Sequence, residues 1–164
     1  MEILKATEDQ TGIIRDLATQ SWNVHYHNII SQQQIDYMLE MMYADSVLKA
    51  HWKQPHYHYY LFRDYCEYLG FMGFEFDYEA YTTKLHRIYF LPHAMGKGFG
   101  REAVDFLTEE VKKIGNRRII LTVNKNNSSK KFYEKCGFKV YDEGIFDIGN
   151  GYVMDDYLME LILK

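Results

Sequence analysis

The amino-acid sequence predicts an α+β fold, in which helices flank a mixed, mostly antiparallel central sheet as an α/β three-layer sandwich. Three observations support this class. Segments with helical periodicity alternate with strand-like segments, aromatic strands follow one another as hairpins, and one strand–helix–strand crossover interrupts them. The chain has 164 residues, of which 47% are hydrophobic, so we expect one domain over residues 1–164 with a single packed core.

The first part of the chain is predicted to form one strand and three helices. Residues 1–6 have the character of a short strand, and residues 11–26 place their apolar side chains on one helical stripe. Thr7 with Gln10, and Ser31 with Gln34, have the spacing of capping boxes at the starts of helices. The second of these precedes apolar residues at helical spacing, and residues 44–52 form a third, shorter amphipathic segment.

The middle of the chain is rich in aromatic residues and is predicted to form strands. Eleven aromatic residues fall within residues 56–81. Two runs, at residues 57–62 and 65–76, are predicted as strands with Arg63 and Asp64 in the turn between them. A further strand covers residues 85–91 and ends at a proline, which cannot donate a backbone hydrogen bond.

The last third alternates helices and strands. A helix is predicted from Gly100 to the Gly115–Asn116 stop, because its apolar residues mark one face. A strand, a helix ended by Gly137 and two terminal strands follow, and a glycine-containing loop separates the terminal pair. Their predicted ranges are residues 118–123, 128–136, 138–141 and 152–163.

Charge and composition exclude several classes of protein. Nineteen basic and 23 acidic residues give a net charge of −4, which is unfavourable for binding nucleic acid. We find no apolar run long enough for a membrane span and no secretory signal, so a cytoplasmic location is expected. Cys66 and Cys136 lack zinc spacing, and His56 and His58 lack a third ligand, so we expect no metal site.

Glycine is scarce but clustered between a predicted strand and a predicted helix. Gly96, Gly98 and Gly100 fall within five residues. Glycines permit close approach of a ligand to the backbone, and free N–H groups at a helix start favour an anion such as a phosphate or pyrophosphate. The pattern fits neither a P-loop nor a dinucleotide-binding fingerprint. A tight turn without a ligand is the alternative.

A second motif gives the glycine cluster a context. Residues 132–138 read FYEKCGF, Asn126 lies seven residues before Tyr133, and Leu91–Pro92 precede the glycines. This combination resembles the GNAT superfamily of acetyl-CoA-dependent N-acetyltransferases over residues 84–138.

Two further segments resemble one bacterial subgroup of that superfamily, whose members acetylate polyamines. They are residues 32–43 and residues 147–160. The resemblance therefore implies a bacterial enzyme, with a polyamine as one candidate acceptor and a homodimer as one candidate assembly.

The resemblance implies a binding site for acetyl-CoA. The pantetheine arm would lie along the strand before the glycines, and the pyrophosphate on the amides of the glycine loop. Met95 stands where the family usually has Gln or Arg, so it offers only its backbone amide. The positions that match the family's cofactor site are Tyr89, Phe90, Leu91, Met95, Gly96, Lys97, Gly98, Phe99, Gly100, Arg101, Asn126 and Tyr133.

The same resemblance implies a general acid. Tyr133 matches the tyrosine that protonates the departing CoA thiolate. The chemistry agrees, because a tyrosine with a pKa near 10 still carries its proton at neutral pH. Packing within an aromatic-rich core is the alternative role for this side chain.

The general base is left with two candidates. Some family members use a Glu on the strand before the glycines, and this chain has Lys84 at that position. His86, on the same strand, titrates in a suitable range, and Glu75 lies on the preceding strand. Either one would accept the proton of the amine, and a surface or structural role is the alternative for both.

Four residues are candidates for the walls of the acceptor groove. In this fold, helices that hold Trp22, Tyr26, Met38 and Met42 would wall the groove, although the same residues equally suit a plain core. An acidic pair, Asp155–Asp156, could attract an amine. Neighbouring residues of a strand face opposite ways, so only one of the two can point inward.

We therefore expect an acetyltransferase that moves the acetyl group of acetyl-CoA directly to a primary amine of a small molecule. Two alternatives remain. One is an enzyme that acetylates the α-amine of a peptide or protein, and the other is a CoA-binding module without catalysis.

Overall fold

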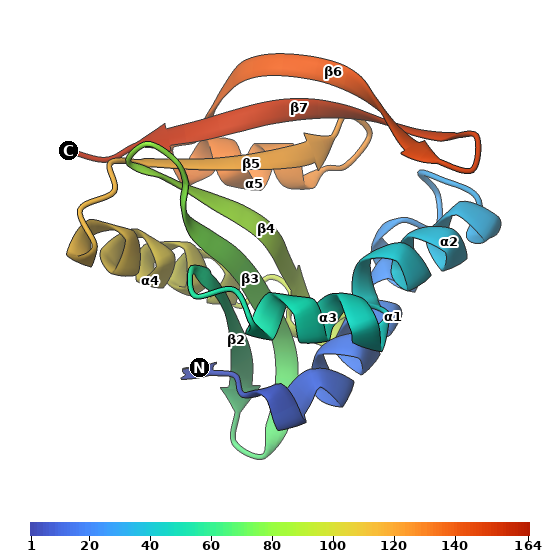
Figure 1. The fold of residues 1–164 in the computed structure, drawn as a ribbon, viewed down its shortest axis with the longest axis horizontal. Coiled ribbons are helices and arrows are strands. Elements are labelled where there is room, and N and C mark those ends of the chain that lie inside the picture. The colour runs from blue at the N-terminus through green and yellow to red at the C-terminus, as the bar shows by residue number, and fades with distance from the viewer.

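The computed structural model describes residues 1–164, and a seven-stranded sheet organises the chain (Figure 1). The strands are β1 (Glu2–Lys5), β2 (Tyr57–Asp64), β3 (Glu67–Glu79), β4 (Thr82–Phe90), β5 (Arg118–Asn124), β6 (Lys139–Gly149) and β7 (Tyr152–Ile162). The helices are α1 (Thr11–His25), α2 (Gln32–Tyr43), α3 (Asp45–Trp52), α4 (Phe99–Lys113) and α5 (Ser129–Lys135), with short 3-10 turns η1 (Glu8–Gln10) and η2 (Pro92–Ala94).

The sheet is mixed and mostly antiparallel, as predicted. Its order is β1-β2-β3-β4-β5-β7-β6, and only β4 and β5 run parallel to each other. That pair is joined by α4, which is the crossover connection that parallel neighbours require. The predicted fold class is therefore confirmed.

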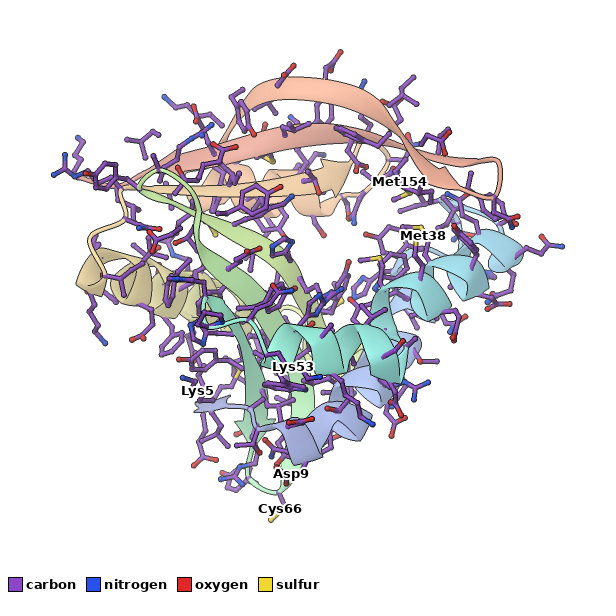
Figure 2. The ribbon with its side chains drawn as sticks, viewed as in Figure 1. Lys5, Asp9, Met38, Lys53, Cys66 and Met154 are labelled. Carbon is purple, nitrogen blue, oxygen red and sulfur yellow. The ribbon has the colours of Figure 1, made fainter.

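Helices cover both faces of the sheet and form two hydrophobic clusters. The first cluster joins α1, α2 and α3 to one face, and the second joins α4 and α5 to the other. Met38 of α2 and Met154 of β7 belong to the first cluster and lie near each other where α2 approaches the β6–β7 hairpin (Figure 2). Each large side chain buried in this way contributes about 1.5 to 3 kcal/mol.

The start of α2 follows the predicted cap only in part. The Ser31 hydroxyl accepts a hydrogen bond from the Gln34 amide at 3.1 Å, as an N-cap residue should. The Gln34 side chain, however, donates to the carbonyl of Val153 at 3.0 Å. Gln34 thus fastens α2 to β7 and does not complete a capping box.

The first hairpin turn lies later than predicted. Arg63 and Asp64 belong to β2, and the turn falls at Tyr65–Cys66, where Tyr65 has a φ of 52°. The reason lies outside the hairpin, because β1 pairs with this end of β2 and Glu2 forms a 2.8 Å ion pair with Arg63.

The strand after the last helix is much longer than predicted. β6 continues to Gly149, whereas the sequence indicates a strand only over residues 138–141. It is an edge strand whose side chains are nearly all exposed or half-buried, so no buried face gives its sequence an alternating apolar pattern. Pairing with β7 along almost its whole length holds it in place.

A bulge in β4 shapes the region of the predicted site. Gly73 pairs with Arg87 and Phe74 pairs with Leu85, which leaves His86 without a partner on β3. An extra residue of this kind turns two successive side chains toward the same side. His86 and Arg87 consequently both contact Tyr57 of β2.

None of the helices is long and apolar enough to cross a membrane.

Candidate active site

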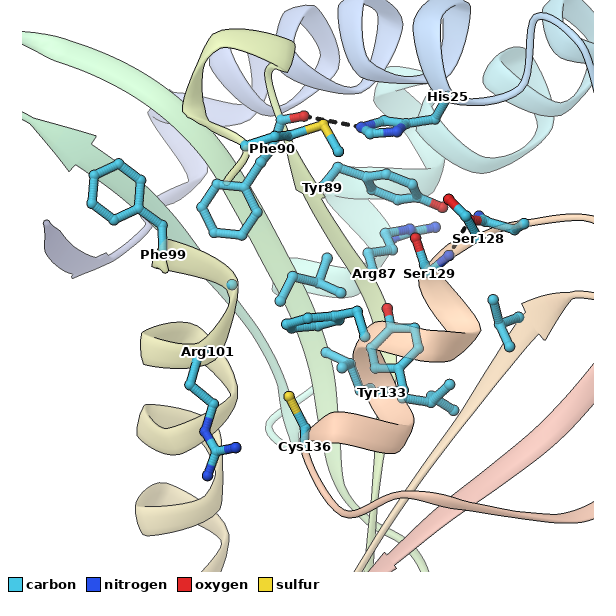
Figure 3. A pocket seen from close by; sticks show the side chains of 18 of the residues that line it. His25, Arg87, Tyr89, Phe90, Phe99, Arg101, Ser128, Ser129, Tyr133 and Cys136 are labelled. Atoms are coloured by element: carbon cyan, nitrogen blue, oxygen red, sulfur yellow. Dashed lines mark hydrogen bonds between the residues drawn. The ribbon is translucent and has the colours of Figure 1, made fainter. Parts of the chain in front are cut away.

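A cleft opens where β4 and β5 separate. The two strands pair only between Thr82–Lys84 and Arg118–Ile120. Beyond this point they diverge, and a cavity of about 570 Å³ lies between them, closed below by α5 and at one end by the glycine turn (Figure 3). The backbone of β4 that faces the gap therefore has no partner strand and is free to pair with a ligand.

The glycine turn presents a run of unused backbone donors. Gly96 and Gly98 adopt φ values of 77° and 84°, which side chains disfavour. None of the five amides from residue 96 to residue 100 donates a hydrogen bond within the chain. These amides precede and begin α4, whose dipole adds positive potential, so the turn suits a phosphate or pyrophosphate.

Glycine is also required where elements meet tightly around the cleft. A Cβ added at Gly100 would lie 3.0 Å from the ring of Phe132, so this residue lets α4 approach α5. A Cβ at Gly70 of β3 would lie 2.1 Å from the backbone oxygen of Tyr89. The second contact is with backbone, so the close pairing of β3 with β4 behind the cleft depends on Gly70.

Tyr133 projects from α5 into the cleft. Its side chain is 9% exposed, and its hydroxyl makes no hydrogen bond within the chain. The hydroxyl points toward the side of the cleft where Arg87 and Tyr89 lie (Figure 3). Burial raises the pKa of Tyr133, and the nearby Tyr26 raises it further, so this phenol keeps its proton at neutral pH.

Aromatic side chains form the wall between β4 and α1. Tyr26 and Tyr89 line the cleft, their hydroxyls lie 3.5 Å apart, and Trp22 stacks on Tyr26 from the core side. The ring nitrogen Nε2 of His25 lies 3.1 Å from the carbonyl oxygen of Phe90. This contact fixes the end of α1 against the last residue of β4.

His86 and Glu75 form a pair beside this wall. Nε2 of His86 lies 3.0 Å from the Glu75 carboxylate, and the imidazole stacks on Tyr57. Burial, together with the cations Lys84 and Arg87, lowers the pKa of His86. The neutral imidazole therefore donates its Nε2–H to Glu75.

The acidic pair on β7 is separated by the pleat. Asp155 faces outward and forms a 2.9 Å ion pair with Lys125. Asp156 faces inward, is 9% exposed and leaves its Oδ1 without a hydrogen bond. Burial and the neighbouring Asp155 raise the pKa of Asp156 to about 6.

Most of the sequence-predicted site residues meet at the cleft. Those that line it are Tyr26, His86, Tyr89, Phe90, Met95, Gly96, Gly98, Phe99, Gly100, Arg101 and Tyr133. Glu75 does not line the cleft but contacts His86, which does. Three predicted residues, Leu91, Lys97 and Asn126, do not line the cleft. Trp22 and Met38 are buried in the core, and Met42 packs against that core.

Asn127, rather than Asn126, lines the cleft. Asn126 is exposed, and its amide donates to the side chain of Asn124. The sequence reasoning also missed His25, Arg87, Ser128 and Ser129, which line the cleft as well. Only the bulge at His86 and the packing of α1 bring the first two there, and neither leaves a signal in the sequence.

Comparison with known proteins assigns the family. The family model described as "Acetyltransferase (GNAT) family" matches residues 13–138. The chain therefore belongs to the GNAT acetyltransferase family and is an acyltransferase. This membership confirms the predicted dependence on acetyl-CoA. Among curated proteins, none matches this chain by sequence.

Solved structures share the fold at low sequence identity. The PaiA N-acetyltransferase of Thermoplasma acidophilum, in complex with coenzyme A, superposes with a TM-score of 0.83 at 23% identity, covering 98% of each chain. YncA of Salmonella typhimurium, a putative acetyltransferase with its cofactor acetyl-CoA, gives 0.66 at 20% identity, covering 100% of this chain and 94% of its own. The spermidine/spermine N-acetyltransferase SpeG of Vibrio cholerae gives 0.69 at 17% identity, covering 98% and 91%.

Proposed function

We propose that residues 1–164 form one catalytic domain that transfers the acetyl group of acetyl-CoA directly to a primary amine of a small molecule. The observation that carries this proposal is the combination of five unused amides with a protonated phenol in one cleft. The first feature suits a pyrophosphate and the second suits a leaving thiolate, and CoA contains both groups.

The residues of the cleft suit the hydrogen-bonding groups of the cofactor. The unused amides of residues 96–100 would hold the pyrophosphate. The amides of Met95 and Arg101, which the sequence also suggests, already donate to the carbonyls of Pro92 and Gly98 at 3.1 and 3.0 Å. The backbone of Tyr89, Phe90 and Leu91, where β4 has left β5, would pair with the pantetheine amides. When bound, acetyl-CoA supplies an activated thioester. Of the two residues that the sequence suggests for stabilising the negative charge on its carbonyl oxygen, Leu91 is unsuitable, because its amide already donates to the carbonyl of Leu69 at 2.8 Å. A backbone N–H near Phe90 would take this role.

Tyr133 would donate the proton that the leaving thiolate needs. Its hydroxyl has no competing partner within the chain, and burial keeps it protonated. A thiol has an ordinary pKa near 8.5, well below that of this phenol in its free state. Because the phenol is the weaker acid, it would keep its proton until negative charge develops on the sulfur. It would donate the proton at that point, as a general acid does.

The His86–Glu75 pair would remove the proton of the acceptor amine. An alkylammonium with a pKa near 10 is about one part in a thousand neutral at pH 7, so the reaction needs a proton acceptor. Burial and the nearby cations lower the pKa of His86 to about 3, so its imidazole is a weak base. Glu75 at 3.0 Å would therefore have to stabilise the imidazolium that forms. This assignment keeps both sequence candidates and gives them different roles.

The finer points of the function rest on the sequence resemblance. A polyamine as acceptor, a homodimer and a bacterial, cytoplasmic setting all follow from that resemblance or from composition. Acetylation of a peptide α-amine and binding of CoA without catalysis are the two competing outcomes of the experiment below.

The experiment combines CoA binding with an amine panel. We expect CoA to raise the melting temperature and at least one amine to release free thiol from acetyl-CoA. Tyr133→Phe should lower kcat roughly 100- to 10,000-fold with little change in CoA affinity. Tyr141→Phe, at an exposed tyrosine of β6, is the matched control. No thermal shift with CoA would end the proposal, and binding without turnover would favour the non-catalytic module.

A further inference from the structure

Arg87 is a buried cation on the wall of the cleft. It is 7% exposed, and its Nη1 donates to the hydroxyl of Tyr57 at 3.0 Å and to that of Tyr59. Its Nη2 donates to the carbonyl of Met42 at 2.9 Å, and the ring of Tyr43 lies 4.7 Å from its guanidinium carbon. All of these partners are neutral.

No carboxylate balances this charge. Arg87 takes part in none of the ion pairs of the structure. Its Nε is buried and has no hydrogen-bond partner, and the same holds for Trp22 Nε1 and Tyr43 Oη beside it. Burying a cation without a counter-charge is costly, so an anionic ligand here would be stabilised strongly.

The unused donors of Arg87 have the arrangement that a carboxylate needs. The guanidinium carries five N–H donors. The two on Nη1 and one on Nη2 are engaged, which leaves the Nε–H and the second Nη2–H. Nε and Nη2 lie along one edge of the guanidinium, and an arginine can bind both oxygens of a carboxylate through that edge. Nε is enclosed in this structure, so a neighbouring side chain has to move for a carboxylate to reach it.

A buried acid lies near the same cleft. Asp156 of β7 faces inward, carries an unpartnered oxygen and forms no ion pair. Asp156 does not line the cleft itself, but it pairs with Asn124, the last residue of β5, and the chain that follows brings Asn127 and Ser128 to the cleft. Arg87 on the wall of the cleft and Asp156 beside the end of β5 are therefore two buried charged groups of opposite sign, and neither takes part in an ion pair.

We propose that the acceptor is an amine that also carries a carboxylate, that is, an amino acid or a close analogue. Arg87 binds the carboxylate, and Asp156 attracts the ammonium group before it loses its proton. This inference rests on the proposed acetyl transfer and names its substrate class. A polyamine carries only positive charge and would leave Arg87 unpaired.

Matched pairs of amines test this proposal on the wild-type protein. Each pair differs only by the carboxylate: ornithine against putrescine, lysine against cadaverine, and phenylalanine against phenethylamine. Among the amines that carry a carboxylate, we expect the best substrates to have a kcat/KM roughly 10- to 100-fold above that of their partners without the carboxylate. Equal rates, or a preference for putrescine, cadaverine or spermidine, would overturn the proposal.

Substitutions of Arg87 then test the residue itself. In Arg87→Gln the ratio of kcat/KM within each pair should fall to near one, and Arg87→Lys should retain part of it. A ratio that survives Arg87→Gln would refute the role of Arg87. Thermal shift with CoA shows that each variant is folded, and carboxylates without an amine, such as pentanoate, should inhibit the wild type competitively against the acceptor.

Failure of the substrate class is distinguishable from failure of the transferase activity. If CoA binds but no amine turns over, the proposed function fails. The carboxylate site is then judged by calorimetry alone, with ornithine and putrescine titrated into the CoA complex. Tighter binding of ornithine, lost in Arg87→Gln, supports the site, and equal or weaker binding refutes it.

Discussion

Replacing Asp156 with Asn should stabilise the protein at neutral pH. Asp156 is buried on β7 with no cation and an unpartnered oxygen, so its ionised form is poorly solvated. Burial first and Asp155 second raise its pKa from 3.8 to about 6. An asparagine has nearly the same shape and carries no charge, so the variant avoids the cost of ionisation.

The size and sign of the effect follow from this pKa. Between pH about 4 and about 6 the folded state binds more protons than the unfolded state, so the free energy of unfolding falls as the pH rises. The difference between 3.8 and about 6 corresponds to roughly 3 kcal/mol, since each pH unit is worth about 1.4 kcal/mol. The advantage of Asp156→Asn is therefore small at pH 4 and complete above pH 7.

Urea or thermal unfolding of both proteins from pH 4 to pH 8 measures this advantage. A gain of 2 to 3 kcal/mol in a chain of this size corresponds to roughly 5 to 10 °C in Tm. Asp16→Asn, at an exposed carboxylate of α1 without an ion pair, is the control and should stay within about 0.5 kcal/mol. A constant difference between Asp156→Asn and wild type across the pH range would refute the reasoning.

Two further predictions concern the glycines. Gly98→Ala places a side chain at a φ of 84°, so we expect a loss of about 1 to 2 kcal/mol and weaker CoA binding by calorimetry. Gly12→Ala, in open space in α1, should instead gain about 0.4 to 1 kcal/mol, and a gain from both would contradict the strain argument. Gly70→Ala forces a Cβ against the backbone oxygen of Tyr89, so we expect a loss of roughly 2 to 4 kcal/mol in urea unfolding. An unchanged unfolding midpoint would show that β3 and β4 separate freely.

Local patterns in the sequence were enough to predict most of the fold. Helical periodicity defined α1, α2 and α4 to within a few residues, because each buries one continuous apolar stripe. β6 was largely missed because an exposed edge strand is held by backbone pairing, which leaves no such stripe. The position of the first turn depended on β1, a partner far away in the sequence.

The sequence by itself determined the parts of the candidate site that are contiguous in the chain. The glycine turn and the FYEKCGF helix carry their geometry in short motifs, since glycine conformation and helix spacing are local properties. Only the tertiary structure decided which charges reach the cleft. A bulge aims Arg87 at neutral tyrosines, and the pleat of β7 turns Asp156 inward and Asp155 outward. Burial and the absence of a counter-ion depend on many residues that are distant in the sequence. These two conditions set the charge properties of Arg87 and Asp156, so local sequence patterns could not predict them.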